Sequence, residues 1–364
     1  MRILFISGVD VGGAPRSTLE LAYQLVRRGH EIGVVLGSAE SPGRLVSMLT
    51  AAAIKFRQRT GRTWLRAMVR PFGAGGGHGA ADEGVTVWHR RHPENDLRGL
   101  LREFRPGIVI ANSLSREAMR WVLEDCLRHR TPLGLYMREE HSITHLTVSA
   151  LPLDFVIANS EHLAQEARSA GYSCTMVPSI VDLGTSEVSS TRREVVLVNP
   201  VAENRPDVLV ELARSRPDIP CVLQESWDLP SEWRHVVQAW VDSSPNLELR
   251  PPTTDPADIY RHARLLVAPY PSGRPRVVLE AQHNGIPVVA LAQPASSEAV
   301  GPGGVLLAAG LSAAQWSATI ASLWDDPAEY ARLSEAAYRH ARRDEIAVDN
   351  IVAAFEAAIE GVAA

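Results

Sequence analysis

The sequence predicts an α/β protein with two doubly wound, parallel-sheet domains. Short buried strands alternate with amphipathic helices from Arg2 to Val177, and the alternation begins again at Glu194. The stretch Asp182–Arg193 between the two series is polar and rich in serine, as an interdomain linker would be. A length of 364 residues also favours two domains of ordinary size over one.

Composition argues against several classes of protein. A hydrophobic content of 45% and a net charge of −5 indicate a soluble globular chain and argue against a nucleic-acid partner. The three cysteines lie far apart without paired spacing, so neither a disulfide framework nor a zinc site is indicated. The apolar run at residues 1–9 is too short for a signal peptide, and no stretch is long enough to span a membrane. We therefore expect a cytoplasmic protein.

The first strand–helix–strand unit lies at the N-terminus. Arg2–Ser7 is a buried apolar run, and Gly12 and Gly13 supply a tight turn. Ser17–Arg28 carries an apolar stripe at helical spacing, and Glu31–Leu36 returns as a strand. This arrangement predicts a parallel strand pair with a right-handed crossover.

The rest of the first domain continues the same alternation. Its expected elements are the helices Leu97–Phe104 and Glu161–Ala170 and the strands Ile108–Ala111, Leu133–Met137, Phe155–Ala158 and Ser173–Val177. Arg138 and His141 follow one of these strands directly, so we expect both at the carboxyl edge of the sheet.

Residues 57–95 are the least regular part of the chain. Arginines are interleaved there with Trp64 and aliphatic residues, and the glycine-rich stretch Gly73–Gly79 follows. One interpretation is a solvated insertion with an amphipathic helix packed on the domain. The other is an element that contacts an acceptor or a membrane surface, because arginines beside a tryptophan suit phosphorylated groups and anionic lipid. The sequence leaves both open.

The second domain is predicted from the strands Glu194–Val198, Pro220–Gln224 and Asn246–Leu249 and the helix Asp207–Arg214. The segment that organises it is Arg264–Leu291, in which the strand Leu265–Ala268, a proline-rich loop, a helix from about Arg276 to Asn284 and the strand Ile286–Leu291 follow one another. Gly285 stands where a left-handed helix cap is needed.

The N-terminus of that helix is a candidate anion site. Its first turn, which includes Val277 and Val278, presents unpaired amides and the positive end of the helix dipole. A diphosphate would suit this position. Glu280 lies one turn further along, where a carboxylate would accept hydrogen bonds from sugar hydroxyls, as an acidic residue holds a ribose in dinucleotide folds. A βαβ unit with one glutamate in its helix is common, and most such glutamates are solvated surface residues, so spacing alone leaves that interpretation of Glu280 open.

Two runs of the sequence resemble a known family. Residues 276–291, RVVLEAQHNGIPVVAL, resemble the donor-binding segment of the retaining glycosyltransferases of family four, and residues 154–183 resemble the end of that family's N-terminal domain. The resemblance covers roughly residues 1–50, 97–182 and 194–345. It implies the GT-B fold, in which two Rossmann-like domains face each other across a cleft and the C-terminal helix crosses back to the N-terminal domain.

The resemblance also implies domain boundaries. We expect an acceptor-side domain over residues 1–181, a linker over 182–193 and a domain that binds the nucleotide sugar over 194–345. Residues 346–364 would form the helix that returns to the first domain. Gly12, Gly13 and Arg138 would then lie on the acceptor side of the cleft.

The family usually carries two glutamates eight positions apart, the first on the donor sugar and the second on the nucleotide ribose. Glu280 matches the second, but Ser272 stands at the first position. Arg274, close by, replaces a residue that is usually apolar. The departure supports either an unusual donor sugar or a loss of activity.

A basic residue that pairs with the donor diphosphate normally follows the first strand of the second domain, as a lysine before a glycine. Asn204 and Arg205 occupy those places here, and Arg205 could supply the charge, although a surface role is also open.

His141 matches a family histidine that touches the donor sugar, which makes His141 and Arg205 the expected catalytic residues. For His141 a structural role and, with Glu140 and His145, a metal site are alternatives, but no further metal ligand is visible in the sequence. The resemblance implies no metal and no cofactor.

Two functions follow. The first is a retaining, metal-independent glycosyltransferase with a nucleotide sugar as donor and a small or lipid-linked acceptor, with peripheral membrane contact open. The second is an inactive GT-B protein that binds nucleotide or a partner.

Overall fold

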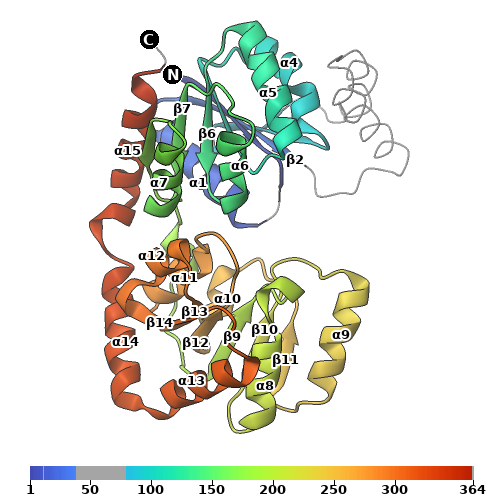
Figure 1. The fold of residues 1–364 in the computed structure, drawn as a ribbon, viewed down its shortest axis with the longest axis vertical. Coiled ribbons are helices and arrows are strands. Elements are labelled where there is room, and N and C mark those ends of the chain that lie inside the picture. The colour runs from blue at the N-terminus through green and yellow to red at the C-terminus, as the bar shows by residue number, and fades with distance from the viewer. Residues whose placement is uncertain (11, 38–78, 363–364) are drawn as a thin grey trace. The chain divides into compact units, whose positions relative to one another are not determined.

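The computed structural model describes residues 1–10, 12–37 and 79–362, and these residues form two compact units. Met1–Ile180 together with Val348–Ala364 make the first unit, and Val181–Ala347 make the second. Each unit is a sheet covered by helices on both faces (Figure 1). Residues 57–78, in which arginines are interleaved with Trp64, lie outside the described residues, as does the predicted contact with an acceptor or a membrane surface.

The sheet of the first unit has the strand order β3-β4-β2-β1-β5-β6-β7-β8. Among the described strands every pair is parallel except β3 with β4. The strands are β1 (Arg2–Ser7), β2 (Glu31–Gly37), β3 (Ala80–Asp82), β4 (Val85–Arg90), β5 (Ile108–Asn112), β6 (Leu133–Met137), β7 (Phe155–Ala158) and β8 (Cys174–Met176). The helices are α1 (Gly13–Arg27), α4 (Pro93–Glu103), α5 (Arg116–His129), α6 (Ile143–Thr147), α7 (Glu161–Ser169) and α15 (Val348–Glu360).

Alternation along β1 explains why helices cover both faces of this sheet. Leu4 and Ile6 pack with residues of α4, α5 and α7, whereas Ile3 and Phe5 pack with residues of α1 and α15. Side chains on a strand point alternately to opposite faces, so a strand buried on both faces is apolar throughout.

The last helix, α15, belongs to the first unit although the second unit precedes it in the chain. It lies against α1 and β7 (Figure 1). Phe355 is fully buried and stacks on Phe5, with ring centroids 5.8 Å apart. The apolar stripe of the C-terminal segment is therefore the face that covers the first sheet.

The sheet of the second unit has the strand order β11-β10-β9-β12-β13-β14, and its described pairs are all parallel. The strands are β9 (Glu194–Val198), β10 (Cys221–Gln224), β11 (Leu247–Arg250), β12 (Ala263–Ala268), β13 (Val288–Leu291) and β14 (Gly304–Leu307). The helices are α8 (Asp207–Ser215), α9 (Ser231–Asp242), α10 (Pro256–Tyr260), α11 (Arg276–His283), α12 (Pro294–Val300), α13 (Ala313–Asp325) and α14 (Pro327–His340).

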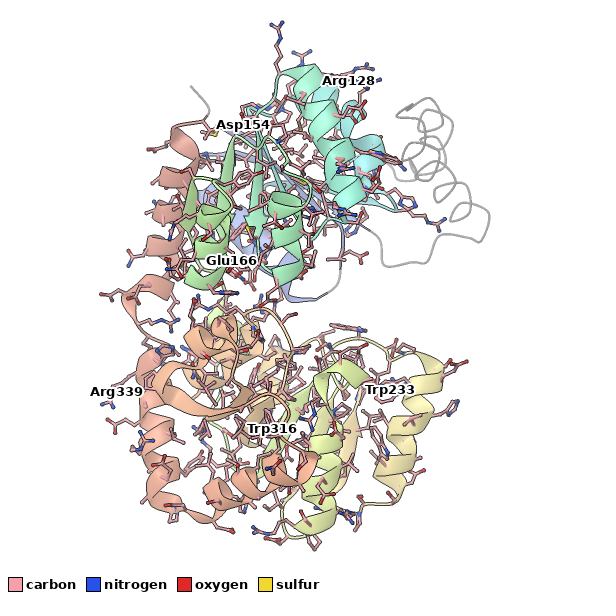
Figure 2. The ribbon with its side chains drawn as sticks, viewed as in Figure 1. Arg128, Asp154, Glu166, Trp233, Trp316 and Arg339 are labelled. Atoms are coloured by element: carbon pink, nitrogen blue, oxygen red, sulfur yellow. The ribbon has the colours of Figure 1, made fainter. Side chains whose placement is uncertain are left out.

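Two of these helices, α9 and α13, are anchored to the unit by a tryptophan side chain. Trp316 of α13 is fully buried in the core of the unit, and Trp233 of α9 donates from Nε1 to the carbonyl of Pro200 at 2.8 Å (Figure 2). The expected linker is bound to this unit, since Ser190 donates to the carbonyl of Ala263 and the amide of Val188 to Oδ1 of Asn284.

The structure corrects the expected irregularity of residues 57–95. Ala80–Asp82 and Val85–Arg90 form an antiparallel pair at the edge of the first sheet, and α4 already begins at Pro93. The sequence analysis also missed α5, α6, α9, α10, α12, α13 and β14. The prediction that Gly285 ends α11 in a left-handed conformation is confirmed by its φ of 64°.

Candidate nucleotide-sugar site

The candidate site lies at the carboxyl edge of the six-stranded sheet, beside β9 and β12. From β9 the chain adds β10 and β11 on one side and then β12, β13 and β14 on the other, so the strand order reverses between β9 and β12. The hydroxyl of Tyr270 donates to the carbonyl of Val198 at 3.0 Å and ties the ends of these two strands together. In open α/β sheets, ligands bind outside the carboxyl ends of the strands at such a reversal.

The loops that follow β9 and β12 carry most of the donor-side residues that the sequence analysis selected. Asn204 and Arg205 lie in the loop after β9, whereas Ser272 and Arg274 lie in the loop after β12. The two strands are paired in parallel, so both loops leave the sheet at the same edge. The tertiary structure therefore brings together residues that are about seventy positions apart in the chain.

Helix α11 begins at this edge without a side-chain cap. Pro275 occupies the N-cap position and no acidic residue lies in the first turn, so the positive end of the helix is not neutralised locally. Val277 is partly buried and Val278 is buried. The amide of Val278 already donates to the carbonyl of Pro275 at 3.2 Å, so its predicted contact with a diphosphate would compete with this bond.

Glu280 is buried rather than solvated, with 2% of its surface exposed. Its carboxylate accepts one hydrogen bond at each oxygen. Oε2 accepts from the hydroxyl of Tyr260 at 2.6 Å, and Oε1 accepts from Nε of Arg276 at 2.8 Å. The interpretation of Glu280 as a solvated surface residue is therefore wrong.

Ser272 and Arg274 differ in their surroundings. Ser272 is exposed. Arg274 is partly buried near His340, the last residue of α14, and near Arg343, which follows that helix. Burial, and then the charge of Arg274, lower the pKa of Arg343 to about 10. Burial lowers the pKa of His340 from its usual value, and the charges of Arg343 and Arg274 lower it further. The guanidinium groups of Arg274 and Arg343 thus lie near each other, and Nε of Arg343 lies 3.7 Å from Oε2 of Glu345.

Arg205 has a left-handed backbone, with φ of 49°, and its guanidinium is already engaged. Nη1 donates to the carbonyl of Leu311 at 2.9 Å, and Nη2 contacts Oδ2 of Asp207 at 3.1 Å. Asn204 donates from Nδ2 to the carbonyl of Asn199 at 2.8 Å, which holds the loop in a tight turn. The charge of Arg205 is therefore fixed in position at the carboxyl edge.

The acceptor-side residues of the sequence analysis lie together in the first unit. Gly12 is the N-cap of α1 with φ of 97°, a conformation that favours glycine, and Gly13 opens the helix. Arg138 follows β6 and donates from Nη1 to the carbonyl of Ala14 at 2.6 Å, with its guanidinium over the ring of Tyr136. Arg138 therefore anchors the edge of β6 to the first turn of α1.

His141 lies in the short 3-10 helix Glu140–Ser142, and its side chain is half exposed. Its Nδ1 lies 2.9 Å from Oε2 of Glu139, and this hydrogen bond raises the pKa of His141 above its usual value although burial opposes the shift. His145 is buried, and its Nε2 pairs with the carbonyl of Leu114 at 3.0 Å. Within the described ranges, no group of three or more His, Cys, Asp or Glu is arranged to hold a metal ion.

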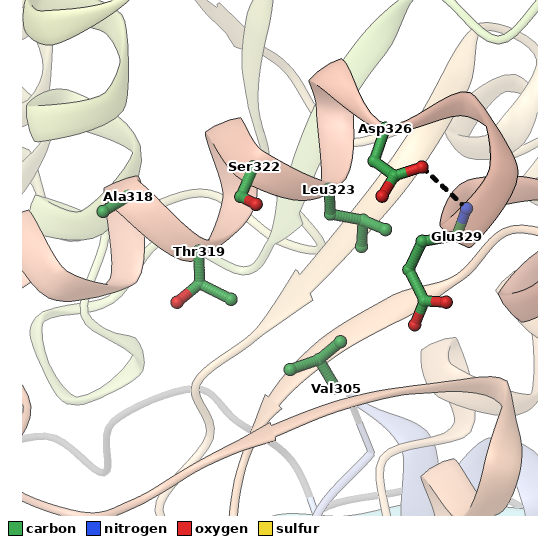
Figure 3. A pocket seen from close by; sticks show the side chains of 7 residues that line it. All are labelled: Val305, Ala318, Thr319, Ser322, Leu323, Asp326 and Glu329. Atoms are coloured by element: carbon green, nitrogen blue, oxygen red, sulfur yellow. Dashed lines mark hydrogen bonds between the residues drawn. The ribbon is translucent and has the colours of Figure 1, made fainter.

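A pocket of about 380 Å³ lies elsewhere in the second unit (Figure 3). Its lining comes from α13, α14 and β14 and consists of Val305, Ala318, Thr319, Ser322, Leu323, Asp326 and Glu329. Asp326 is occupied as the N-cap of α14, where Oδ1 accepts from the amide of Glu329 at 2.9 Å, and the Glu329 carboxylate pairs with Arg332. This pocket contains none of the donor-side residues.

The sequence analysis missed Tyr260 and Arg276. The spacing of Arg276 and Glu280, four residues apart on one helix face, could have indicated the ion pair. Nothing in the sequence links Tyr260 to Glu280, because they lie on different helices that only the tertiary fold brings together.

Comparison with known proteins identifies the fold. Sucrose-phosphate synthase from Thermosynechococcus elongatus superposes with a TM-score of 0.76 at 14% identity, over 100% of this chain and 99% of that one. HepE from Anabaena, crystallised with UDP-glucose, superposes with a TM-score of 0.72 at 17% identity over the whole of both chains. The chain has the GT-B fold.

A family match falls on the candidate site of this GT-B chain. Residues 248–340 match the family model described as "Glycosyl transferases group 1", which covers β12, its loop and α11. D-inositol 3-phosphate glycosyltransferase of Thermobispora bispora is 42% identical over 102 residues, which is 27% of this chain and 24% of that relative. The match thus spans about a quarter of the curated relative's length. In the part of the GT-B chain that the structure describes, no helix is long and apolar enough to cross a membrane.

Proposed function

We propose that this protein is a retaining, metal-independent glycosyltransferase that moves a sugar from a nucleotide-sugar donor to an acceptor. The observation that carries the proposal is the reversal of strand order between β9 and β12, with Arg205 after one strand and α11 with Glu280 after the other. That edge provides a cation and a helix N-terminus for a diphosphate and a carboxylate for sugar hydroxyls. The group 1 family match over residues 248–340 and the UDP-glucose bound by HepE support a nucleotide-sugar donor.

In this mechanism, the bond between the anomeric carbon and the diphosphate breaks and a bond to the acceptor hydroxyl forms on the same face. The acceptor's proton leaves with the diphosphate, so no protein base has to remove it. Arg205 and the first turn of α11 stabilise the negative charge that grows on the diphosphate, and Glu280 orients the nucleotide. His141 would contact the donor sugar. The residues assigned here need no cofactor.

Binding and turnover test the proposal in two steps. Thermal-shift measurements with UDP, GDP and ADP should show stabilisation by one of them, since a ligand at about 100 times its dissociation constant adds roughly 2.7 kcal/mol. Incubation with the matching nucleotide sugars and candidate small or lipid-linked acceptors should then release the nucleoside diphosphate. Absence of any nucleotide-dependent stabilisation at millimolar concentration contradicts the proposal.

Ser272 favours a second candidate, an inactive GT-B protein that binds nucleotide or a partner. An exposed serine stands where the related enzymes carry the glutamate that contacts the donor sugar. Nucleotide binding without release of diphosphate from any donor would support this candidate. An active enzyme for a deoxygenated or substituted donor sugar would instead release diphosphate from that donor alone.

The proposal includes a cytoplasmic location. Cys126, Cys174 and Cys221 are all buried free thiols, which suits a reducing compartment. Cell fractionation tests it, with recovery from the membrane fraction after a salt wash as the outcome that favours a peripheral association instead.

A further inference from the structure

The carboxylate of Glu280 is held from two directions by residues that the proposed reaction does not itself require. Tyr260, at the end of α10, approaches Oε2, and Arg276, in the first turn of α11, approaches Oε1. Tyr260 is fully buried, whereas the side chain of Arg276 is 10% exposed. A glutamate has three side-chain torsions, and two hydrogen bonds at different oxygens restrict it to one arrangement.

Two acceptors lie within hydrogen-bonding distance of the Tyr260 hydroxyl, and the carboxylate of Glu280 is the nearer one. The carbonyl of Val277 lies 3.5 Å from this hydroxyl, compared with 2.6 Å for the carboxylate. A buried tyrosine needs only one acceptor for its proton. The shorter hydrogen bond of Tyr260 is therefore the one to Glu280, the residue that is proposed to accept from the sugar hydroxyls.

The hydroxyl stays protonated at every physiological pH. Burial raises the pKa of Tyr260 well above its usual value, and the nearby charge of Glu280 raises it further. Tyr260 therefore keeps the proton that it donates to Oε2 of Glu280 at 2.6 Å.

The remaining hydrogen-bonding capacity of Glu280 matches a vicinal diol. An ionised carboxylate offers about two acceptor positions at each oxygen. Tyr260 takes one at Oε2 and Arg276 takes one at Oε1, so each oxygen retains a position. The 2′ and 3′ hydroxyls of a ribose supply two donors, and a 2′-deoxyribose supplies only one.

We infer that Tyr260 is a positioning residue that makes this site selective for ribonucleotides, by holding Glu280 so that both carboxylate oxygens accept from the ribose diol. The inference rests on the proposed function, because it takes Glu280 as the ribose contact. Tyr260 itself does not touch the nucleotide.

The test compares a nucleoside diphosphate with its 2′-deoxy analogue, using whichever of UDP, GDP and ADP binds best. The parent protein should prefer the ribose form by about tenfold, the effect of one hydrogen bond to a charged group. Tyr260→Phe, in the full chain, should reduce this preference to roughly threefold or less, because the carboxylate is no longer fixed at Oε2. An unchanged preference overturns the inference and leaves the proposed function standing.

Tyr270→Phe is the matched control. Tyr270 is buried in the same apolar cluster and its substitution also removes one hydrogen bond, to the carbonyl of Val198, whereas the carboxylate of Glu280 is bonded to Tyr260 and Arg276. Loss of the Tyr270 hydroxyl should lower the thermal stability of the protein without changing its preference for the ribose form. If Tyr270→Phe reduces the preference as much as Tyr260→Phe, the effect is general loosening and the inference is wrong.

A double substitution separates positioning from a direct role. In a Glu280→Ala background, Tyr260→Phe should leave the ribose preference unchanged, whereas a further fall of equal size contradicts the inference. Should Tyr260→Phe not fold, Glu280→Asp withdraws the carboxylate from Tyr260 by one methylene and should lower the preference in the same way. Failure of the parent protein to bind any nucleotide overturns the proposed function, and the inference with it.

Discussion

Nε2 of His30 lies 2.9 Å from Oε1 of Glu356, although 326 residues separate them in the chain. Glu356 also pairs with Arg28, and the two basic residues stand at the end of α1 and just before β2. These contacts flank Phe355, whose ring fills the space between Phe5 and Tyr136. The C-terminal helix is therefore part of the core of the first unit.

Phe355→Ala should destabilise the first unit strongly. Removing a fully buried phenylalanine typically costs about 3–5 kcal/mol, because the ring's apolar contacts are lost and a cavity remains. Urea unfolding followed by tryptophan fluorescence would measure the loss. Glu356→Gln is the control, and it should cost about 1 kcal/mol or less because its ion pairs are partly exposed. Equal costs for the two variants would contradict this account of α15.

Glu280→Ala should weaken nucleotide binding by about 1.5–3 kcal/mol, the value of hydrogen bonds to a charged group. Isothermal titration at a temperature well below unfolding would measure it. Glu225→Ala is a matched control, because Glu225 is equally buried in the same unit and pairs with Arg234. The Glu225→Ala variant should be less stable than the parent protein but should bind the nucleotide with unchanged affinity. Unaltered nucleotide affinity in Glu280→Ala removes Glu280 from the site.

Arg205→Gln should weaken UDP more than UMP, if UDP is the nucleotide bound. The guanidinium is held at the carboxyl edge by the carbonyl of Leu311, and its charge is proposed to meet the β-phosphate that UMP lacks. We expect a loss of roughly tenfold for UDP, corresponding to one charge-assisted bond. Equal losses for UDP and UMP would show that Arg205 only shapes the loop.

Ser272→Glu tests what the departure from the related enzymes means. A serine is shorter and neutral, and it donates as well as accepts, so the parent protein should use UDP-glucose or UDP-N-acetylglucosamine poorly. If the native donor is unusual, Ser272→Glu should impair the native reaction and gain weak activity on these common donors, as measured by UDP release. If the protein is inactive, the substitution changes nothing. Efficient transfer from a common UDP-hexose by the parent chain would show that position 272 does not determine the donor.

The titration of His141 depends on its neighbour. Because the hydrogen bond that His141 donates to Glu139 raises the pKa of His141, the pair stabilises the folded state below the unfolded pKa of histidine, and this contribution is lost as the pH rises through the folded value. Glu139→Gln should therefore shift the pKa of His141 downward. NMR titration of the ring protons would report the shift. A pKa of His141 that is the same in both proteins contradicts the assignment.

The strands and helices of both units were predictable where the sequence pattern is strong. The residues between Arg2 and Ser7 and the run Leu133–Met137 are apolar because both faces of a parallel sheet are covered. Helix α9 was missed although Trp233, Val237 and Trp240 recur at helical spacing in the sequence and pack on the core of the second unit. The hairpin Ala80–Arg90 was missed because its first strand is fully exposed and carries no alternating pattern.

By itself, the sequence determined the two alternating series, the turn at Gly285 and the placement of Glu280 one turn into α11, because these depend on interactions between residues close in the chain. Only the tertiary structure decided that the loops after β9 and β12 share one edge, that Phe355 completes the first core, and that Tyr260 holds Glu280. Each of these is a contact between distant segments, and it exists because strand pairing and burial bring those segments together.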